Sequence, residues 1–209
     1  MITGDSTEYD LLTKWTETLP FFENPKSVVT CEIGVRKGLG SKSIIDAMRK
    51  RIGKDVHYEH IGIDPYGDLN YQHFDEEIQN QLKWKDKDGN ESPTPPTYPD
   101  SMRIEMLNDF SSFKEFNFYH MTDIRFMKFF TTEDKIYDLV HFDGEHTTQS
   151  VLRAAIWFAD RSRKGTRFIF DDYKHYFMED ISKALTHFGF NILDNGTNLS
   201  TRKGINKKQ

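Results

Sequence analysis

The sequence has 209 residues, 28 of them basic and 33 acidic, which gives a formal net charge of −5. This balance argues against a module that binds double-stranded nucleic acid, because such modules normally present a basic face. The single cysteine excludes a disulfide framework, and no apolar run approaches the roughly 18 residues of a membrane-spanning helix. The first residues show neither the basic nor the apolar region of a secretory signal peptide. We therefore expect a cytoplasmic protein with no membrane or nucleic-acid partner.

Segments typical of strands alternate with segments typical of helices along most of the sequence. The pattern predicts strands at residues 27–35, 57–64, 116–122, 137–143 and 166–171. It predicts helices before residue 19 and at residues 43–52, 147–160 and 179–188. The dipeptide at 195–196, Asn-Gly, predicts a closing hairpin between residues 191–194 and 198–201. This order indicates one α/β domain over residues 1–209, with a mostly parallel central sheet and an antiparallel closing strand.

Residues 83–100 interrupt this alternation between the second and third expected strands. The segment holds four prolines and shows no apolar period. Long segments of this kind in compact domains are usually lids over a functional site or disordered insertions. The sequence leaves both interpretations open.

A glycine-containing turn follows the first expected strand, with Glu32 before it and glycines at 34, 38 and 40. Glycine permits positive φ and close approach of a ligand, and open α/β sheets bind ligands at the carboxyl ends of their strands. The spacing matches neither a P-loop nor the dinucleotide-binding fingerprint. Glu32 would also repel a pyrophosphate. A phosphate-free cationic nucleoside, such as S-adenosylmethionine, fits better, with Glu32 placed to bind its ammonium group.

Asp64 ends the second expected strand, in the sequence His60-Ile-Gly-Ile-Asp64-Pro65. A carboxylate at this place can accept hydrogen bonds from both hydroxyls of a ribose. Alone, Glu32 and Asp64 could be ordinary solvated residues at strand ends. Together with the glycine turn between them, they predict a nucleoside site.

Further charged residues follow the fourth and fifth expected strands, Asp143 and His146 after one and Asp171 and Asp172 after the other. These strand ends are neighbours in a parallel sheet, so the carboxylates would repel one another unless a divalent cation lies between them. Oxygen ligands favour Mg²⁺, Mn²⁺ or Ca²⁺. Asp171 and Asp172 can both reach one ion only if the strand has ended before them. Alternatively, Asp143 and Asp172 could cap the following helices.

Residues 27–173 resemble the class I S-adenosylmethionine-dependent methyltransferases. The resemblance implies a three-layer Rossmann-like methyltransferase fold. The residues that it assigns to S-adenosylmethionine are Glu32, Gly34, Gly38, Asp64, Thr122 and Asp123.

The Asp-Gly-x-His sequence at 143–146, followed by Asp171-Asp172, is similar to the metal-dependent macrocin-type sugar O-methyltransferases. It is more distantly similar to catechol O-methyltransferase. This resemblance implies Mg²⁺, with Mn²⁺ or Ca²⁺ as alternatives, bound by Asp143, Asp171 and Asp172. It also implies that His146 acts as general base, so that His146 and Asp143 form the catalytic pair.

The expected reaction is methyl transfer to a hydroxyl group of a small molecule, such as a sugar, a polyketide glycoside or a phenol. A metal ion lowers the pKa of the hydroxyl, and a histidine can take its proton at neutral pH. The alternatives are an inactive S-adenosylmethionine- or nucleotide-binding module and an NAD-dependent oxidoreductase, which the glycine spacing disfavours. The net charge disfavours a nucleic-acid methyltransferase. A homo-oligomer is compatible with the sequence.

Overall fold

The structure of this chain is a computed structural model. It describes residues 2–4, 8–21, 25–67, 75–76, 84–85, 90–92, 98–175, 177–194 and 204–209.

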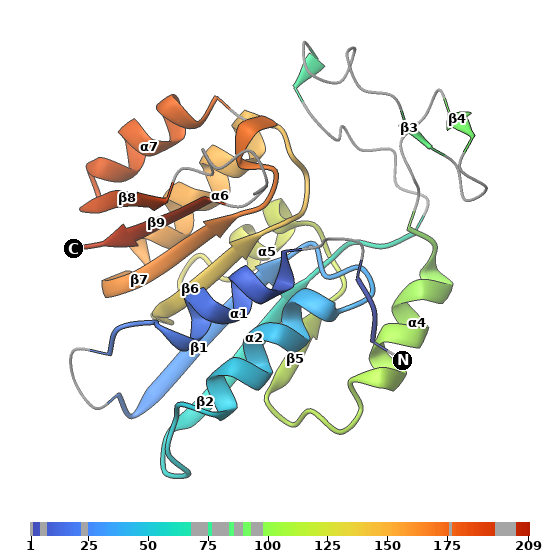
Figure 1. The fold of residues 1–209 in the computed structure, drawn as a ribbon, viewed down its shortest axis with the longest axis horizontal. Helices are drawn as coiled ribbons and strands as arrows, with labels where there is room; N and C mark the ends of the chain where they lie inside the picture. The colour runs from blue at the N-terminus through green and yellow to red at the C-terminus, as the bar shows by residue number, and fades with distance from the viewer. Residues whose placement is uncertain are drawn as a thin grey trace.

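Among these residues, seven strands form one sheet in the order β5-β2-β1-β6-β7-β9-β8 (Figure 1). The strands are β1 (Ser27–Ile33), β2 (His57–Ile63), β5 (Phe116–Tyr119), β6 (Tyr137–Phe142), β7 (Ser162–Phe170), β8 (Phe190–Asp194) and β9 (Gly204–Lys208). Neighbouring strands from β5 to β7 are parallel. β9 is antiparallel to both β7 and β8. The predicted α/β fold, with a mostly parallel sheet and an antiparallel closing strand, is confirmed.

Helices cover both faces of the sheet. They are α1 (Tyr9–Glu17), α2 (Leu39–Arg49), α4 (Asp100–Asp109), α5 (Asp123–Phe129), α6 (Thr148–Asp160) and α7 (Met178–Thr186), with a 3₁₀ turn at Tyr173–His175. No helix of the described residues is long and apolar enough to cross a membrane.

Each face of the sheet has its own apolar cluster, because successive side chains of a strand point to opposite faces. On one face, Leu12 of α1 and Ile44 of α2 pack with Leu139 of β6. On the other face, α5, α6 and α7 pack against the sheet, with Val140 of β6 among the buried residues. The helices therefore form two layers with the sheet between them (Figure 1).

Helix α4 lies at the β5 edge, where Met106 and Phe110 pack with Ile45 of α2. The sequence pattern did not predict α4, and the helix buries only Met106 among its residues. The sequence pattern did not predict helix α5 either. The strand predicted at residues 116–122 ends earlier, at Tyr119. The Thr122 side chain instead caps α5 by accepting a hydrogen bond from the Arg125 amide at 3.3 Å.

The closing strand pair also differs from the prediction. Its first strand, β8, includes the expected residues 191–194, and its partner is β9 at Gly204–Lys208. The strand predicted at residues 198–201 lies outside the described residues.

An insertion follows β2 and ends before α4. Gly67 and Tyr98 form an antiparallel bridge, with the Gly67 amide donating to the Tyr98 carbonyl at 2.9 Å. Between them, β3 (Trp84–Lys85) pairs with β4 (Glu91–Ser92) in a separate antiparallel sheet (Figure 1). The segment predicted as a loop or lid, residues 83–100, lies partly outside the described residues. Its role as a lid stays a prediction.

Candidate cofactor and metal site

The predicted site residues follow the ends of adjacent parallel strands in a single row. In each case the backbone amide of the first residue past a strand donates to the carbonyl of the last residue of the neighbouring strand in the sheet. The bonds are Asp64 to Tyr119 at 3.3 Å, Gly34 to Ile63 at 2.8 Å, Asp143 to Ile33 at 2.9 Å and Asp171 to Phe142 at 3.0 Å. The row places all four residues on the carboxyl edge of the sheet, where open α/β folds bind their ligands.

The glycine turn packs directly against the loop that carries Asp143. Gly34 has φ 86°, and a Cβ atom on it would collide with the Asp143 backbone. Gly38 also has φ 86° and precedes α2. Only glycine satisfies both the conformation and the contact at position 34. The turn and the Asp143 loop therefore pack in direct contact, with no room for a side chain between them.

Asp64 holds the glycine turn through its side chain. One carboxylate oxygen accepts from the Arg36 amide at 3.0 Å and the other from the Tyr66 amide at 2.9 Å. Burial raises the pKa of Asp64, and the backbone amides oppose this shift. The carboxylate thus stabilises Arg36 and Tyr66 in positive-φ conformations. Contact with a ribose stays a prediction.

A pocket opens at the glycine turn. Its lining includes Glu32, Gly34, Gly38 and Asp143 from the predicted site, and also Gly40. Thr3, Gly4 and Tyr9 from the beginning of the chain line it as well, and Thr3 forms a parallel bridge with Gly38. Sequence reasoning missed these three residues, because nothing in their spacing places them beside the turn.

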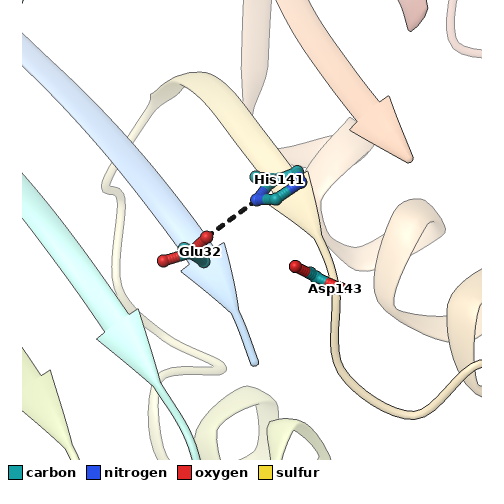
Figure 2. A group of neighbouring side chains, drawn as sticks. All are labelled: Glu32, His141 and Asp143. Carbon is teal, nitrogen blue, oxygen red and sulfur yellow. Dashed lines mark hydrogen bonds and ion pairs between the residues drawn. The ribbon is translucent and has the colours of Figure 1, made fainter. Parts of the chain in front are cut away.

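Glu32 lies at the base of this pocket and is almost wholly buried, with 1% of its surface exposed. Figure 2 shows its carboxylate facing His141 of β6, with Asp143 beyond. One oxygen contacts His141 Nδ1 at 2.8 Å, and the other accepts a hydrogen bond from Ser41 Oγ at 2.5 Å. A Cβ atom on Gly40 would collide with the carboxylate. Gly40 therefore lets the first turn of α2 approach Glu32 closely.

A second charged group lies beside the pocket. Asp143, His146 and Asp171 each offer a ligand atom within 4.8 Å of the other two. This donor set of two carboxylates and one imidazole suits a divalent cation. Asp143 also belongs to a group of the same kind with Glu32 and His141. Asp143 therefore lies where the pocket and the charged group meet.

His146 is buried between two carboxylates. Its Nε2 atom is 3.5 Å from Asp143 Oδ1, and its Nδ1 atom is 3.8 Å from Asp172 Oδ2. Burial lowers the pKa of His146, but the carboxylates of Asp143, Asp172 and Asp171 outweigh it, so the pKa is raised above its ordinary value.

Asp172 occupies a different place from Asp171. The strand β7 ends at Phe170, so both aspartates follow it, and Asp172 adopts φ 49°. Its Oδ1 atom lies 3.6 Å from His175 Nδ1, whereas its Oδ2 atom faces His146. The structure thus brings Asp143, His146 and Asp171 into one group and places Asp172 against His146. Ligation of an ion by Asp172 stays a prediction.

Thr122 and Asp123 lie past the end of β5 and do not line the described pocket. The Thr122 hydroxyl caps α5, and burial raises the pKa of Asp123. Their contact with an adenine ring stays a prediction.

Residues 31–173 match the model of a family described as a methyltransferase domain. The match covers more than half of the chain. The chain belongs to this methyltransferase-domain family. The prediction of a methyltransferase is thereby confirmed at the level of the family. A comparison with curated proteins gave no match.

Solved methyltransferase structures share the fold of this methyltransferase-domain protein. CalS11, a calicheamicin methyltransferase, is 13% identical with a TM-score of 0.56, over 96% of this chain and 77% of that chain. An O-methyltransferase from Bacillus cereus is 9% identical with a TM-score of 0.54, over 98% and 81%. A putative rRNA methylase from Clostridium thermocellum is 10% identical with a TM-score of 0.56, over 99% and 98%. At these identities the similarity shows the fold alone.

Proposed function

We propose that this protein is an S-adenosylmethionine-dependent O-methyltransferase assisted by a divalent cation. The observation that carries the proposal is the row of Asp64, Gly34, Asp143 and Asp171 along the carboxyl edge of the sheet. This row places the pocket that contains the Glu32 carboxylate next to a group of carboxylates and an imidazole. Methyl transfer to a hydroxyl needs a methyl donor and an acceptor oxygen that are held close and aligned, and these two neighbouring regions could hold them.

The cofactor half of the proposal rests on Glu32 and the glycine turn. A buried carboxylate at the base of the pocket complements an ammonium group, whereas it would repel a phosphate. The Bacillus cereus enzyme was solved in complex with S-adenosylhomocysteine, and TomG from Streptomyces achromogenes in complex with S-adenosylmethionine. These neighbours support the same ligand class here.

The metal half rests on the carboxylates of Asp143 and Asp171, with His146 beside them. Their donor atoms fit a divalent cation, and the mutual repulsion of the carboxylates favours one. When bound, such a cation lowers the pKa of an acceptor hydroxyl and fixes its direction. Mg²⁺ suits the carboxylates, with Mn²⁺ or Ca²⁺ as alternatives.

His146 is the proposed general base. Asp172 lies against its Nδ1 atom, so it orients the ring and leaves Nε2, on the Asp143 side, to accept the proton of the acceptor hydroxyl. The hydroxyl oxygen forms a bond to the methyl carbon while the bond from that carbon to sulfur breaks. The electron pair of the broken bond stays on sulfur, which gives S-adenosylhomocysteine. The chain forms no covalent bond in this scheme.

The proposed acceptor is a small hydroxylated molecule, a sugar, a polyketide glycoside or a phenol. The net charge of −5 and the carboxylates around the site oppose a polyanionic acceptor such as nucleic acid. CalS11 is described as a TDP-rhamnose 3′-O-methyltransferase, which supports a sugar hydroxyl as the first acceptor class to test.

Calorimetric titration of the chelator-stripped protein with S-adenosylhomocysteine, with and without Mg²⁺, tests the proposal, with NAD as the control. We expect S-adenosylhomocysteine to bind and NAD not to bind. A separate titration with Mg²⁺ should give heat that the Asp143→Ala variant lacks. If S-adenosylhomocysteine fails to bind under every condition, the proposal of an S-adenosylmethionine-dependent activity is wrong. If it binds but Mg²⁺ does not, only the metal half is wrong.

A further inference from the structure

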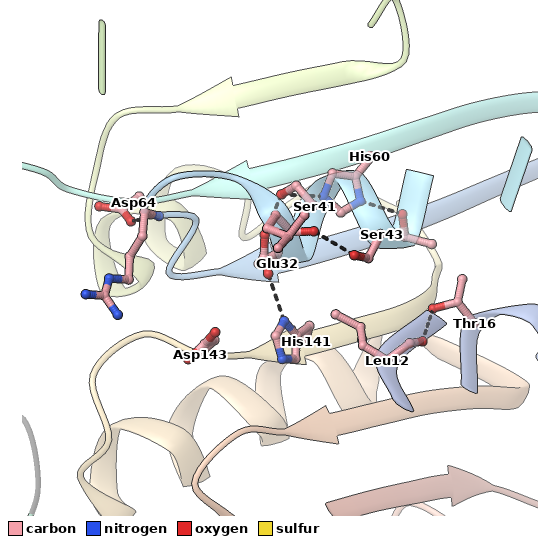
Figure 3. Close-up of polar contacts among 12 residues, drawn as sticks. Leu12, Thr16, Glu32, Ser41, Ser43, His60, Asp64, His141 and Asp143 are labelled. Atoms are coloured by element: carbon pink, nitrogen blue, oxygen red, sulfur yellow. Dashed lines mark hydrogen bonds and ion pairs between the residues drawn. The ribbon is translucent and has the colours of Figure 1, made fainter. Parts of the chain in front are cut away.

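A chain of hydrogen bonds leads away from Glu32 through Ser41 and His60, between β1, β2 and α2 (Figure 3). Ser41 Oγ lies 2.9 Å from His60 Nε2, and His60 Nδ1 lies 2.7 Å from Thr30 Oγ1. Thr30 Oγ1 in turn lies 3.0 Å from the Tyr58 hydroxyl. Ser41, His60 and Thr30 are completely buried. The reaction proposed above uses none of these side chains.

The direction of every hydrogen bond in this chain follows from its two ends. An ionised Glu32 can only accept, so Ser41 donates its hydroxyl proton to it. Ser41 must then accept from His60 Nε2–H. Burial lowers the pKa of His60 to about 3, so its ring is neutral and Nδ1 accepts from the Thr30 hydroxyl. Burial also raises the pKa of Tyr58, which keeps its hydroxyl protonated as the first donor.

His141 completes the arrangement from the other strand. Its Nδ1 atom lies 2.8 Å from the Glu32 oxygen that Ser41 does not contact, and both residues are buried. An ionised Glu32 therefore accepts one donor on each oxygen. A glutamine at this position would turn its own amide protons toward one of these donors. With His141 as the tautomer that carries its proton on Nδ1, the surroundings of Glu32 match a carboxylate and not its neutral isostere.

We propose that Ser41 and His60 are positioning residues that hold Glu32 as an oriented negative charge at the base of the pocket, and so select ligands with an ammonium group. This inference rests on the proposed binding of S-adenosylmethionine. Ser41 and His60 touch no ligand in this scheme. They act through Glu32, so their effect depends on whether the ligand carries the positive charge.

Two ligands separate this role from a general contribution to folding. S-adenosylhomocysteine carries the ammonium group, whereas 5′-methylthioadenosine retains the nucleoside and lacks the amino-acid portion. Calorimetry on Ser41→Ala should show roughly tenfold weaker binding of S-adenosylhomocysteine, the scale of one hydrogen bond to a charged group. Binding of 5′-methylthioadenosine should change by less than about twofold, since it does not depend on Glu32.

Ser43→Ala is the matched control, because Ser43 lies on the same helix and donates to the Leu39 carbonyl at 2.8 Å instead of to Glu32. It should leave the affinity for both ligands unchanged. His60→Leu should repeat the ligand-selective loss, and His60→Gln, which retains a donor toward Ser41, should recover most of it. Circular dichroism of each variant confirms that it is folded.

Three results would overturn the inference. Equal weakening of both ligands in Ser41→Ala would show a structural role only. Unchanged affinity for S-adenosylhomocysteine in folded Ser41→Ala and His60→Leu would show that Glu32 needs neither residue. If the wild-type protein binds no S-adenosylhomocysteine at all, the proposed function itself fails, and the inference fails with it.

Discussion

Two charged regions lie side by side at the carboxyl edge of the sheet, and the protein treats them differently. Around Glu32, short hydrogen bonds of 2.5 and 2.8 Å from Ser41 and His141 match the carboxylate with donors from the chain itself. Around His146, the distances to Asp143 and Asp172 are 3.5 and 3.8 Å, and acidic groups predominate. The Glu32 carboxylate is stabilised by hydrogen bonds from the chain itself. The carboxylates around His146 repel one another, and an added cation would reduce this repulsion.

This contrast explains why Asp143 is the most informative position to change. It follows β6, belongs to the charged group and lines the pocket. The largest expected effects therefore come from Asp143 and from Gly34, which packs on it, and smaller effects from residues that serve only one region.

Replacing Asp143 with alanine should lower the rate of methyl transfer roughly a thousandfold, the scale of losing metal assistance. S-adenosylhomocysteine should still bind, because Glu32 keeps its donors. Steady-state assays with Mg²⁺ and calorimetry measure the two effects. Asp160→Ala, at the exposed end of α6, is the control and should match the wild type. Full activity of Asp143→Ala would contradict the assignment of metal assistance to the region around His146.

Replacing Gly34 with alanine should destabilise the fold by about 3 kcal/mol, because the new Cβ atom adds a collision with the Asp143 backbone to an unfavourable positive φ. Denaturation with urea measures the loss. Gly53→Ala is the matched control, because a Cβ atom there meets nothing within 4 Å. A Gly34→Ala variant as stable as the control would show that the turn and the Asp143 loop do not pack in direct contact.

The burial of His60 in the hydrogen-bond network should make the stability of the fold depend on pH. The ordinary pKa of histidine is 6.5, and burial lowers that of His60 to about 3. Between these values the unfolded chain binds a proton that the folded chain does not, so stability falls as the pH falls. From pH 7.5 to pH 5 the wild type should lose about 2 kcal/mol from this source.

His60→Gln lacks this contribution, so its stability deficit relative to the wild type should shrink by that amount at the lower pH. Urea titrations at both pH values provide the measurement. His57→Gln, at the exposed start of β2, is the control and should follow the wild type at both. A deficit for His60→Gln that stays constant with pH would mean that the pKa of His60 is the same in the folded and the unfolded protein.

The smallest expected effect concerns Thr122, which lies outside both regions. Thr122→Ala should lower stability by about 1 kcal/mol through loss of the α5 cap, and Thr122→Ser should restore it. Calorimetry with S-adenosylhomocysteine on the same variants tests the predicted adenine contact. An affinity loss in Thr122→Ala would extend the cofactor site to this position, whereas unchanged affinity would limit the residue to capping.

The sequence predicted the strands and the charged strand ends well, because both leave local signals. Buried parallel strands appear as apolar runs, and Asp64, Asp143 and Asp171 each follow one directly. Helix α4 left little signal because it buries only Met106. The end of β5 was placed too late because the capping role of Thr122 went unrecognised.

The hydrogen-bond network could not be predicted from spacing, since its members come together only through strand pairing. Thr30 lies opposite His60 in the β1–β2 register, and Glu32 lies opposite His141 in the β1–β6 register. The available signal was the presence of polar residues inside otherwise apolar strands. Such residues need partners when buried, but the sequence alone does not say which ones.

The bridge between Gly67 and Tyr98 has a practical consequence for protein engineering. Because the bridge pairs the two residues on either side of 68–97, we expect that this segment can be replaced as one unit. A two-residue Asn-Gly turn would join the paired ends in an antiparallel hairpin geometry. The exchange removes the contact of Asp75 with Thr148 at the start of α6 but leaves Glu32, Ser41 and the glycine turn intact. Chimaeras with insertions from other family members would test whether this segment affects acceptor preference.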